Sequence, residues 1–108
     1  MKLGDIVLVP FPFSELNNVK VRPAVVIGIT KDKHKDVILC AITSVIPADI
    51  STNEFIVAAD NNTNLRKNSL VKVDRISTIK QLLIITKLGN LSNKDLKIFR
   101  KKFVNLVK

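Results

Sequence analysis

The stretch VKVRPAVVIGI, from Val19 to Ile29, places an arginine and a proline at the start of an apolar run rich in β-branched residues. Such a run predicts a strand. Because proline lacks the N–H group that a central ladder needs, we expect Pro23 at the first residue of a strand or on a sheet edge. The proline ring also holds the preceding residue in extended backbone, so Arg22 should stand at the rim of a sheet. Its guanidinium is then either a solvated strand cap or a group that binds phosphate.

Five further segments share this strand pattern, with Val, Ile and Leu in short runs between Pro, Asn, Asp and Gly. No helical pattern separates these runs. The sequence therefore favours a compact barrel or sandwich over a doubly wound sheet. The expected strands are Asp5–Val9, Ala24–Thr30, Val37–Thr43, Phe55–Ala59, Leu70–Ile76 and Leu83–Leu88.

The C-terminal segment predicts one amphipathic helix. Ser92 and Asp95 form a start that resembles a capping box, with Asp in place of Glu or Gln. An apolar stripe at helical spacing follows, so one helix face should lie across the barrel. The opposite face is basic and is either a solvated surface or a nucleic-acid contact. The stripe is Leu96, Phe99, Phe103 and Leu106, and the basic residues are Lys94, Lys97, Arg100, Lys101, Lys102 and Lys108.

The length of 108 residues favours a single domain over residues 1–108. No apolar run approaches the roughly 18 residues of a membrane span, and the N-terminus has the pattern of a first strand and not of a signal peptide. The single cysteine, Cys40, allows no intrachain disulfide and lies in the apolar run VILCAIT. We expect a buried, inert thiol, no membrane partner and a cytoplasmic protein.

The chain carries a large positive charge, with 18 Lys and Arg against nine Asp and Glu, a formal +9. On a chain of this size the charge implies a polyanionic or acidic partner. Part of the excess can also come from AT-biased coding, since Lys, Asn and Ile are all abundant. The charge thus indicates a partner class without fixing it.

The sequence lacks the residues that several kinds of catalytic and metal site require. The only histidine, His34, lies in the polar connection KDKHKD, without a second His or a Cys near it in sequence, so we expect an exposed turn and no metal site. The three glycines are scattered, which leaves no phosphate-binding loop, and no G-x-S-x-G elbow is present. A conventional histidine-driven hydrolase is disfavoured, and we expect no cofactor.

What remains are polar groups at the ends of apolar strands, which collect at one rim of a barrel. Thr43 closes the run CAITS, and Lys72 and Asp74 lie two residues apart in LVKVDRIST, so both should project from one face of their strand. Each has a structural alternative. Thr43 could simply turn the chain, and Lys72 and Asp74 could be a surface ion pair worth under about 1 kcal/mol.

Five segments, GDIVLVPFPF, RPAVVI, LCAITS, SLVKVDRISTI and LGNLS before a helix, occur in the order and spacing of the MazF/PemK family of bacterial toxin endoribonucleases. The chain resembles the PemK-like branch. The resemblance implies an SH3-like barrel with a C-terminal helix, a homodimer and sequence-specific, metal-independent cleavage of single-stranded RNA. It also implies a cognate antitoxin, with operator DNA bound only through the toxin–antitoxin complex.

The resemblance carries functional residues over by position. The family's catalytic arginine before proline corresponds to Arg22, and its threonine at the end of the third strand corresponds to Thr43. In the Kid branch the fifth strand supplies an Arg and an Asp two apart; here Asp74 matches and Lys72 replaces the arginine. The first loop is short and lacks the glycines of other members, so no loop residue is carried over. The expected RNA-binding residues are Ser44, Lys72, Arg75, Lys20 and Phe11.

The resemblance implies attack of the RNA 2′-hydroxyl on the adjacent phosphate, giving a 2′,3′-cyclic phosphate and a 5′-hydroxyl end. Arg22 suits the stabilisation of the negative charge that builds on phosphorus, and Thr43 can bond a phosphate oxygen. Asp74 is the candidate base. Phe11 and Phe13 share strand parity with buried positions, so they either stack on bases or pack in the core or a dimer.

Two rivals stay open. A CcdB-like toxin of the same fold would inhibit DNA gyrase through protein contacts, although such toxins use an aromatic residue near the C-terminus and this chain ends FVNLVK. A barrel that binds nucleic acid without cutting it is the other rival.

Overall fold

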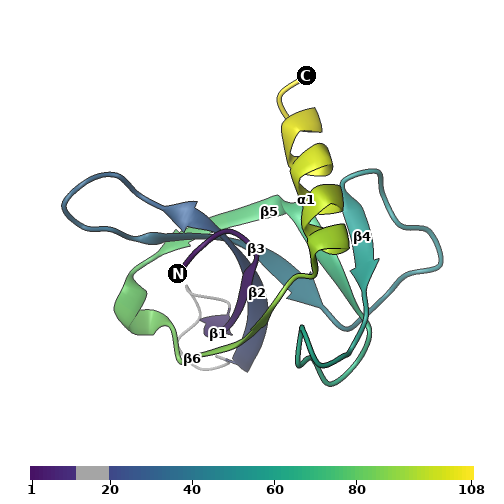
Figure 1. Cartoon of the computed structure of the whole chain (residues 1–108), viewed down its shortest axis with the longest axis horizontal. Coiled ribbons are helices and arrows are strands. Elements are labelled where there is room, and N and C mark those ends of the chain that lie inside the picture. The colour runs from purple at the N-terminus through teal and green to yellow at the C-terminus, as the bar shows by residue number, and fades with distance from the viewer. Residues whose placement is uncertain (12–19) are drawn as a thin grey trace.

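Six antiparallel strands and one C-terminal helix make up the computed structural model, which describes residues 1–11 and 20–108. The strands form one curled sheet in the order β4-β5-β3-β2-β1-β6, with the helix on one side (Figure 1). This confirms the predicted mainly β fold with a terminal helix. The elements are β1 (Asp5–Phe11), β2 (Lys20–Ile29), β3 (Val37–Thr43), β4 (Glu54–Val57), β5 (Ser69–Ile79), the 3-10 turn η1 (Gln81–Leu83), β6 (Thr86–Asn90) and α1 (Asn93–Asn105).

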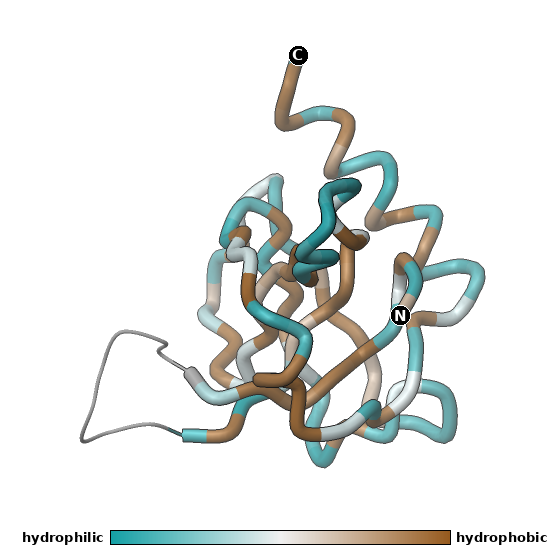
Figure 2. The backbone as a smooth tube through the Cα atoms, turned by 90° about the vertical axis from the view of Figure 1, so that its left-hand side faces the viewer, coloured by the Kyte–Doolittle hydropathy of each residue, from teal (hydrophilic) through white to brown (hydrophobic). Residues whose placement is uncertain are grey.

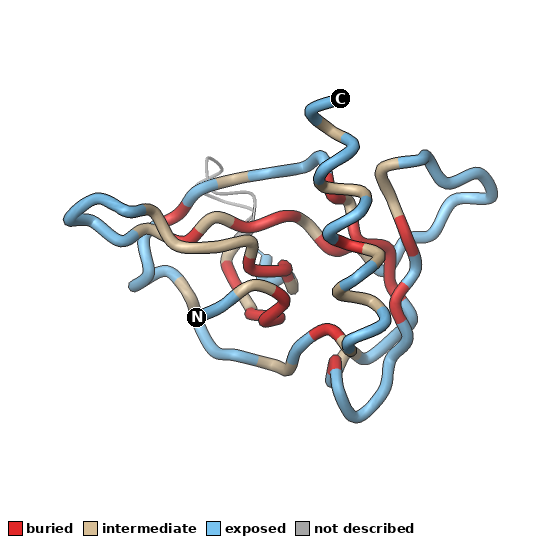
Figure 3. Tube along the Cα trace, turned by 45° about the horizontal axis from the view of Figure 1, so that its top comes forward, coloured by how far each residue is buried: buried red, intermediate tan, exposed pale blue. Residues whose placement is uncertain are grey.

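The curled sheet buries apolar side chains on both of its faces. One cluster includes Val25 and Cys40, paired across β2 and β3, together with Phe99 of α1. The other includes Ala24 and Leu39, the next residues along the same two strands. Successive strand residues point to opposite faces, so this division follows directly from the pairing. Buried segments run through the middle of the strands, whereas the turn between β2 and β3 is exposed (Figure 3).

The helix begins where the sequence predicted. The Ser92 side chain accepts a hydrogen bond from the Asp95 N–H at 3.1 Å, which caps one of the free amides of the first turn. Phe99 is buried and stacks on Phe103 with ring centroids 6.1 Å apart. Figure 2 shows the resulting alternation of apolar and polar residues along the helix. Among the described residues, no helix combines the length and apolar character required to cross a bilayer.

The last strand starts later than predicted. The apolar run from residue 82 suggested a strand over Leu83–Leu88, but that run begins in η1, and β6 covers Thr86–Asn90. Leu82 is 82% exposed, so hydropathy misplaced the boundary. Pairing with β1, from Asp5 opposite Asn90 to Leu8 opposite Thr86, sets the strand instead.

The predicted position of Pro23 was also wrong. Pro23 is the fourth residue of β2, an interior strand, and pairs with Leu8 of β1. The ladder between β2 and β3, however, extends only to the pair Ala24–Ala41. The proline has no N–H to give and lies one residue outside that ladder. The rule that excludes proline from a paired strand therefore holds on the β3 side of Pro23 and not on the β1 side. Beyond this point β2 and β3 are no longer paired.

Candidate functional site

A cleft of about 490 Å³ opens where the β2–β3 pairing stops, and we call it the first cleft. Its lining includes Val9, Ala24 and Leu39, which belong to the core cluster on the sheet face opposite Val25 and Cys40. Further apolar residues and five polar side chains line the rest, and none of the described lining residues is acidic. The polar lining consists of Arg22, Thr43, Lys72, Arg75 and Ser77.

Strand register explains why these side chains meet. Ala24, Ala41 and Lys72 form one cross-strand row over β2, β3 and β5. Arg22 lies two residues before Ala24, and Thr43 lies two residues after Ala41. Because a strand repeats every two residues, Arg22 and Thr43 continue the same face just past the end of the ladder. The structure thus brings Arg22 and Thr43 to one cleft from separate strands.

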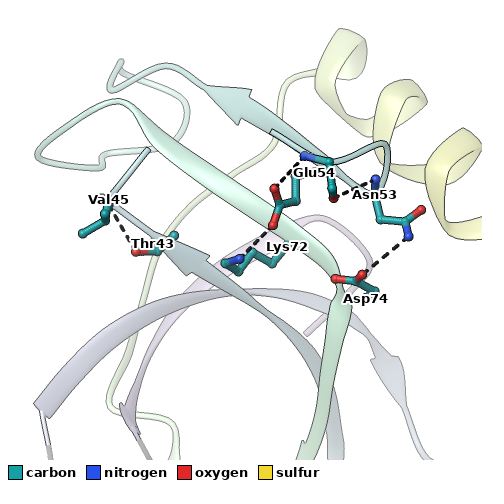
Figure 4. A network of polar contacts seen from close by, with 7 residues as sticks. Thr43, Val45, Asn53, Glu54, Lys72 and Asp74 are labelled. Atoms are coloured by element: carbon teal, nitrogen blue, oxygen red, sulfur yellow. Dashed lines mark hydrogen bonds and ion pairs between the residues drawn. The ribbon is translucent and has the colours of Figure 1, made fainter. Parts of the chain in front are cut away.

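The Thr43 side chain is half-buried at the end of β3. Its hydroxyl oxygen accepts a hydrogen bond from the Val45 N–H at 3.1 Å, which turns the chain after the strand (Figure 4). The turn function considered from the sequence is therefore present. A hydroxyl that accepts one hydrogen bond still carries a proton to donate, so the same side chain can also serve an anionic ligand in the first cleft.

Lys72 is tied to Glu54 of β4. The ammonium donates to the Glu54 carboxylate at 2.7 Å, and the Ser51 N–H donates to the other carboxylate oxygen at 2.9 Å (Figure 4). The hydrogen bond from Lys72, followed by the one from Ser51, holds the pKa of Glu54 below its usual 4.5. At neutral pH this pair removes one net positive charge from the wall of the first cleft.

The structure does not bring Asp74 into the lining of the first cleft. Between the pairs Cys40–Ile76 and Ala41–Lys72 the register shifts, leaving residues 73–75 of β5 without partners on β3. Past this bulge, Arg75 lines the first cleft, whereas Asp74 is exposed and accepts a long 3.5 Å bond from the Asn53 side chain (Figure 4). The simple two-residue alternation assumed from sequence does not extend through such a bulge.

The remaining predicted residues lie apart from that lining. Ser44 lines a neighbouring cleft, described next. Lys20 is exposed at the start of β2, opposite Phe11 in the register with β1, and lines neither cleft. The side chain of Phe11, and Phe13 entirely, fall outside what the structure describes. Their expected contacts stay predictions.

A second cleft, of about 530 Å³, lies on the other side of Arg22. It shares Arg22, Pro23 and Ile42 with the first cleft. This site could not be recognised from the sequence, because residues 60–68, DNNTNLRKN, have the composition of an ordinary polar connection. The adjacent basic residues Arg66 and Lys67 were the only signal. The lining specific to the second cleft includes Val21, Ser44, Asn64, Leu65, Arg66, Lys67, Ser69 and Leu88.

Two other reactive side chains behave as predicted. Cys40 is 1% exposed, and burial raises the pKa of its thiol to about 12, so the sulfur stays protonated and a poor nucleophile at neutral pH. His34 is exposed in the turn between β2 and β3. Within residues 1–11 and 20–108, no group of three or more His, Cys, Asp or Glu side chains could hold a metal ion.

The fold is shared with known toxins. A mycobacterial endoribonuclease, solved in complex with its cognate antitoxin, matches with a TM-score of 0.72 and 11% identity over 99% of this chain and 94% of its own. The toxin MazF-mt6 of Mycobacterium tuberculosis matches with a TM-score of 0.67 and 20% identity over 95% of each chain. A search of curated protein sequences gave no match.

The sequence itself places the chain more closely. A family model described as PemK-like, MazF-like toxin of type II toxin–antitoxin system matches residues 2–107. The chain therefore belongs to the PemK/MazF-like toxin family.

Proposed function

We propose that this protein is the toxin of a type II toxin–antitoxin system and cleaves single-stranded RNA without a metal ion. The observation that carries the proposal is the pair Arg22 and Thr43, which line one cleft beside further cations. Membership of the PemK/MazF-like family supports the toxin role, and the description of one structural neighbour as an endoribonuclease supports the activity.

The chemistry we propose uses a nucleophile that the substrate already contains. The RNA 2′-oxygen forms a bond to the neighbouring phosphorus, and the bond from phosphorus to the 5′-oxygen breaks. The 2′-hydroxyl loses its proton to a base, and the leaving 5′-oxygen gains one. The products are a 2′,3′-cyclic phosphate and a 5′-hydroxyl. Proximity of the attacking group lowers the entropy cost of such a step.

The protein's main contribution is electrostatic. Negative charge grows on the phosphate oxygens as the fifth bond forms, and the planar guanidinium of Arg22 can donate several charge-assisted hydrogen bonds to them. The Thr43 hydroxyl adds a neutral donor beside it. A guanidinium holds its proton too firmly to act as an acid near neutral pH, so the role of Arg22 is to stabilise charge.

Asp74 is the proposed base. Its exposed carboxylate lies outside the lining of the first cleft, beyond Lys72 along β5. It can accept the 2′-hydroxyl proton only when the RNA strand extends along β5 past Lys72. We further propose phosphate or base contacts from Lys72, Arg75 and Ser44, and from the two residues nearest the β1–β2 connection, Phe11 and Lys20. Unpaired nucleotides fit this arrangement because their bases are free to stack and to hydrogen-bond.

Two protein partners complete the proposal. An antitoxin segment rich in acidic residues would be attracted to the same cations as RNA and would block the first cleft. A second copy of the chain would cover apolar side chains that the single chain leaves exposed, including Leu82 and Ile85. A genome in which no antitoxin gene adjoins this one would count against the antitoxin partner.

The decisive experiment compares wild type with Arg22→Ala on single-stranded RNA in excess EDTA. We expect cleavage by wild type, and a loss of roughly a hundredfold or more in kcat for the variant, since one preorganised donor is typically worth that much. Arg22→Lys keeps the charge but not the fork of donors and should recover only part of the rate. End mapping should find cyclic phosphate and 5′-hydroxyl termini.

Arg100→Ala is the matched control, because it removes an arginine from the exposed face of α1. It should cleave like wild type. Intact RNA with the folded wild-type protein would refute the enzyme, and cleavage that EDTA abolishes would refute metal independence. Inhibition of gyrase with intact RNA would support the CcdB-like rival instead.

A further inference from the structure

Hydrogen bonds fix the position of one wall of the second cleft, the connection from β4 to β5. The connection from β4 to β5 is organised by Asp60, whose carboxylate accepts bonds from the N–H groups of Asn62 and Thr63, both at 2.9 Å. The buried Thr63 hydroxyl donates to the Ala58 carbonyl at 2.7 Å. Asn64 donates from its side chain to the Leu88 carbonyl at 2.7 Å, which ties the connection to β6. The wall that carries Arg66 and Lys67 is therefore fixed on the sheet.

The described charged residues that line the second cleft are all basic. Arg66 and Lys67 are both exposed, and with Arg22 they give three cations among the lining residues. None of these described lining residues is acidic. Lys72 is paired with Glu54, whereas the described contacts give Arg66 and Lys67 no ion pair. A concave surface of this kind concentrates a polyanion.

Among the described residues, the two clefts share one charged side chain. Arg22 lines both of them, together with Pro23 and Ile42, where β2 and β3 stop pairing. A phosphate held by Arg22 would leave one neighbouring nucleotide in the first cleft and the other in the second. The second cleft also offers the apolar side chains Val21 and Leu65, which can contact the face of a base, beside the hydroxyl of Ser44.

We propose that the second cleft is an RNA-binding subsite, in which Arg66 and Lys67 hold the phosphates next to the one cleaved at Arg22. The inference rests on the proposed ribonuclease function and extends it by giving the strand a path. Contacts on both sides of the reacting phosphate add binding energy that is equal in the bound RNA and in the transition state, so they lower KM and leave kcat unchanged. Arg66 and Lys67 are binding residues in this scheme and do not touch the reacting atoms.

The test measures binding to a single-stranded RNA that is 2′-O-methylated throughout, which blocks the nucleophile and prevents cleavage. Fluorescence anisotropy compares wild type with the double variant Arg66→Ala/Lys67→Ala. We expect roughly a tenfold or greater loss of affinity, since a hydrogen bond to a charged group is worth about that factor. The dependence of log Kd on log salt should fall in slope by roughly 1.4, at about 0.7 for each lost contact to a single strand.

The matched control is Lys97→Ala/Lys101→Ala, which removes the same charge from exposed positions of α1. It should bind like wild type. On cleavable RNA, Arg66→Ala/Lys67→Ala should raise KM with little change in kcat, whereas Arg22→Ala lowers kcat. An equal loss of affinity in the Lys97/Lys101 variant would mean that only net charge matters, and would overturn the subsite.

The remaining outcomes separate this inference from the proposed function. Cleavage by wild type with unchanged binding in the Arg66/Lys67 variant leaves the ribonuclease intact and refutes the subsite. Failure of folded wild type to bind or cleave RNA refutes both. If RNA binding is unchanged and binding of an acidic peptide of Asp and Glu is lost in the Arg66/Lys67 variant, the second cleft is the binding site of a protein partner and not of RNA.

Discussion

At the scale of single residues, the pair Lys72 and Glu54 decides how much positive charge the first cleft presents. The 2.7 Å contact balances Lys72, so among the described residues Arg22 and Arg75 are the cations of that cleft without an ion pair. The hydrogen bond from Lys72 lowers the pKa of Glu54, so the carboxylate stays charged further into the acid range. Because that pKa lies lower in the folded than in the unfolded chain, the pair stabilises the fold above about pH 4.5 and is lost as the pH falls through the lowered value.

Replacing Glu54 with Gln should strengthen RNA binding. The substitution releases Lys72 and adds one net positive charge beside the proposed phosphate site, so we expect a gain of about fivefold in affinity at low salt. The gain should shrink as salt is added. Asp49→Asn, which removes an exposed carboxylate outside the lining of both clefts, is the control. An affinity equal to wild type would mean that Lys72 does not contact RNA.

At the scale of elements, the contact between β6 and the β4–β5 connection positions the second cleft. Gly89 of β6 packs directly on the backbone of that connection, and a Cβ at this position would lie 2.8 Å from the Thr63 carbonyl oxygen and closer still to that of Asn62. The Asn90 N–H also donates to the Asn62 carbonyl at 2.9 Å. Only glycine allows the two backbones to approach in this way.

Gly89→Ala should therefore displace the connection and disturb the subsite that carries Arg66 and Lys67. We expect a loss of about 1–3 kcal/mol in the free energy of unfolding, as for other overpacked sites, and weaker binding of the 2′-O-methylated RNA. Denaturant unfolding and anisotropy measure the two effects. Gly28→Ala is the matched control, because a Cβ there meets no atom within 4 Å. Equal stability of both variants would show that the connection adapts without cost.

At the scale of the whole molecule, the proposed dimer follows from apolar surface that one chain leaves uncovered. Leu82 is 82% exposed and Ile85 is 54% exposed, close to the start of β6. Ile76, which lines the first cleft, is 44% exposed. A second copy that covers these side chains would reach the edge of the first cleft.

Light scattering on the purified protein should therefore give about twice the chain mass of 12.0 kDa. Leu82→Glu/Ile85→Glu should give a single chain, because burying two new carboxylates in an apolar interface is costly. Val107→Glu, at a residue that is 84% exposed near the C-terminus, is the control and should stay dimeric. A single chain in the wild type would refute the dimer, and a dimer in the Leu82/Ile85 variant would place the interface elsewhere.

The sequence predicted those features that short-range patterns encode. The bounds of β3, the Ser92 cap and the burial of Cys40 and Phe99 all follow from local hydropathy and capping rules. The position of Pro23 and the start of β6 did not, because pairing with β1 fixes both. The bulge in β5 that separates Asp74 from the lining of the first cleft likewise depends on a register between strands.

Part of the candidate site was also predictable, because it depends on a short-range pattern. Arg22 and Thr43 come together through a two-residue repeat that is visible in the sequence, once β2 and β3 are assumed to be neighbours. The second cleft was not predictable, because the position of Arg66 and Lys67 depends on the tight approach of Gly89 to a connection that is distant in sequence. Spacing along one strand carries no information about such contacts.

The shared border at Arg22 has a practical consequence for inhibition. A compact dianion bound to the Arg22 guanidinium would lie between the first and second clefts. A molecule no larger than a nucleotide could therefore prevent RNA from binding across both. Inhibition at this one position would be effective because, among the described residues, Arg22 is the only charged side chain that lines both clefts.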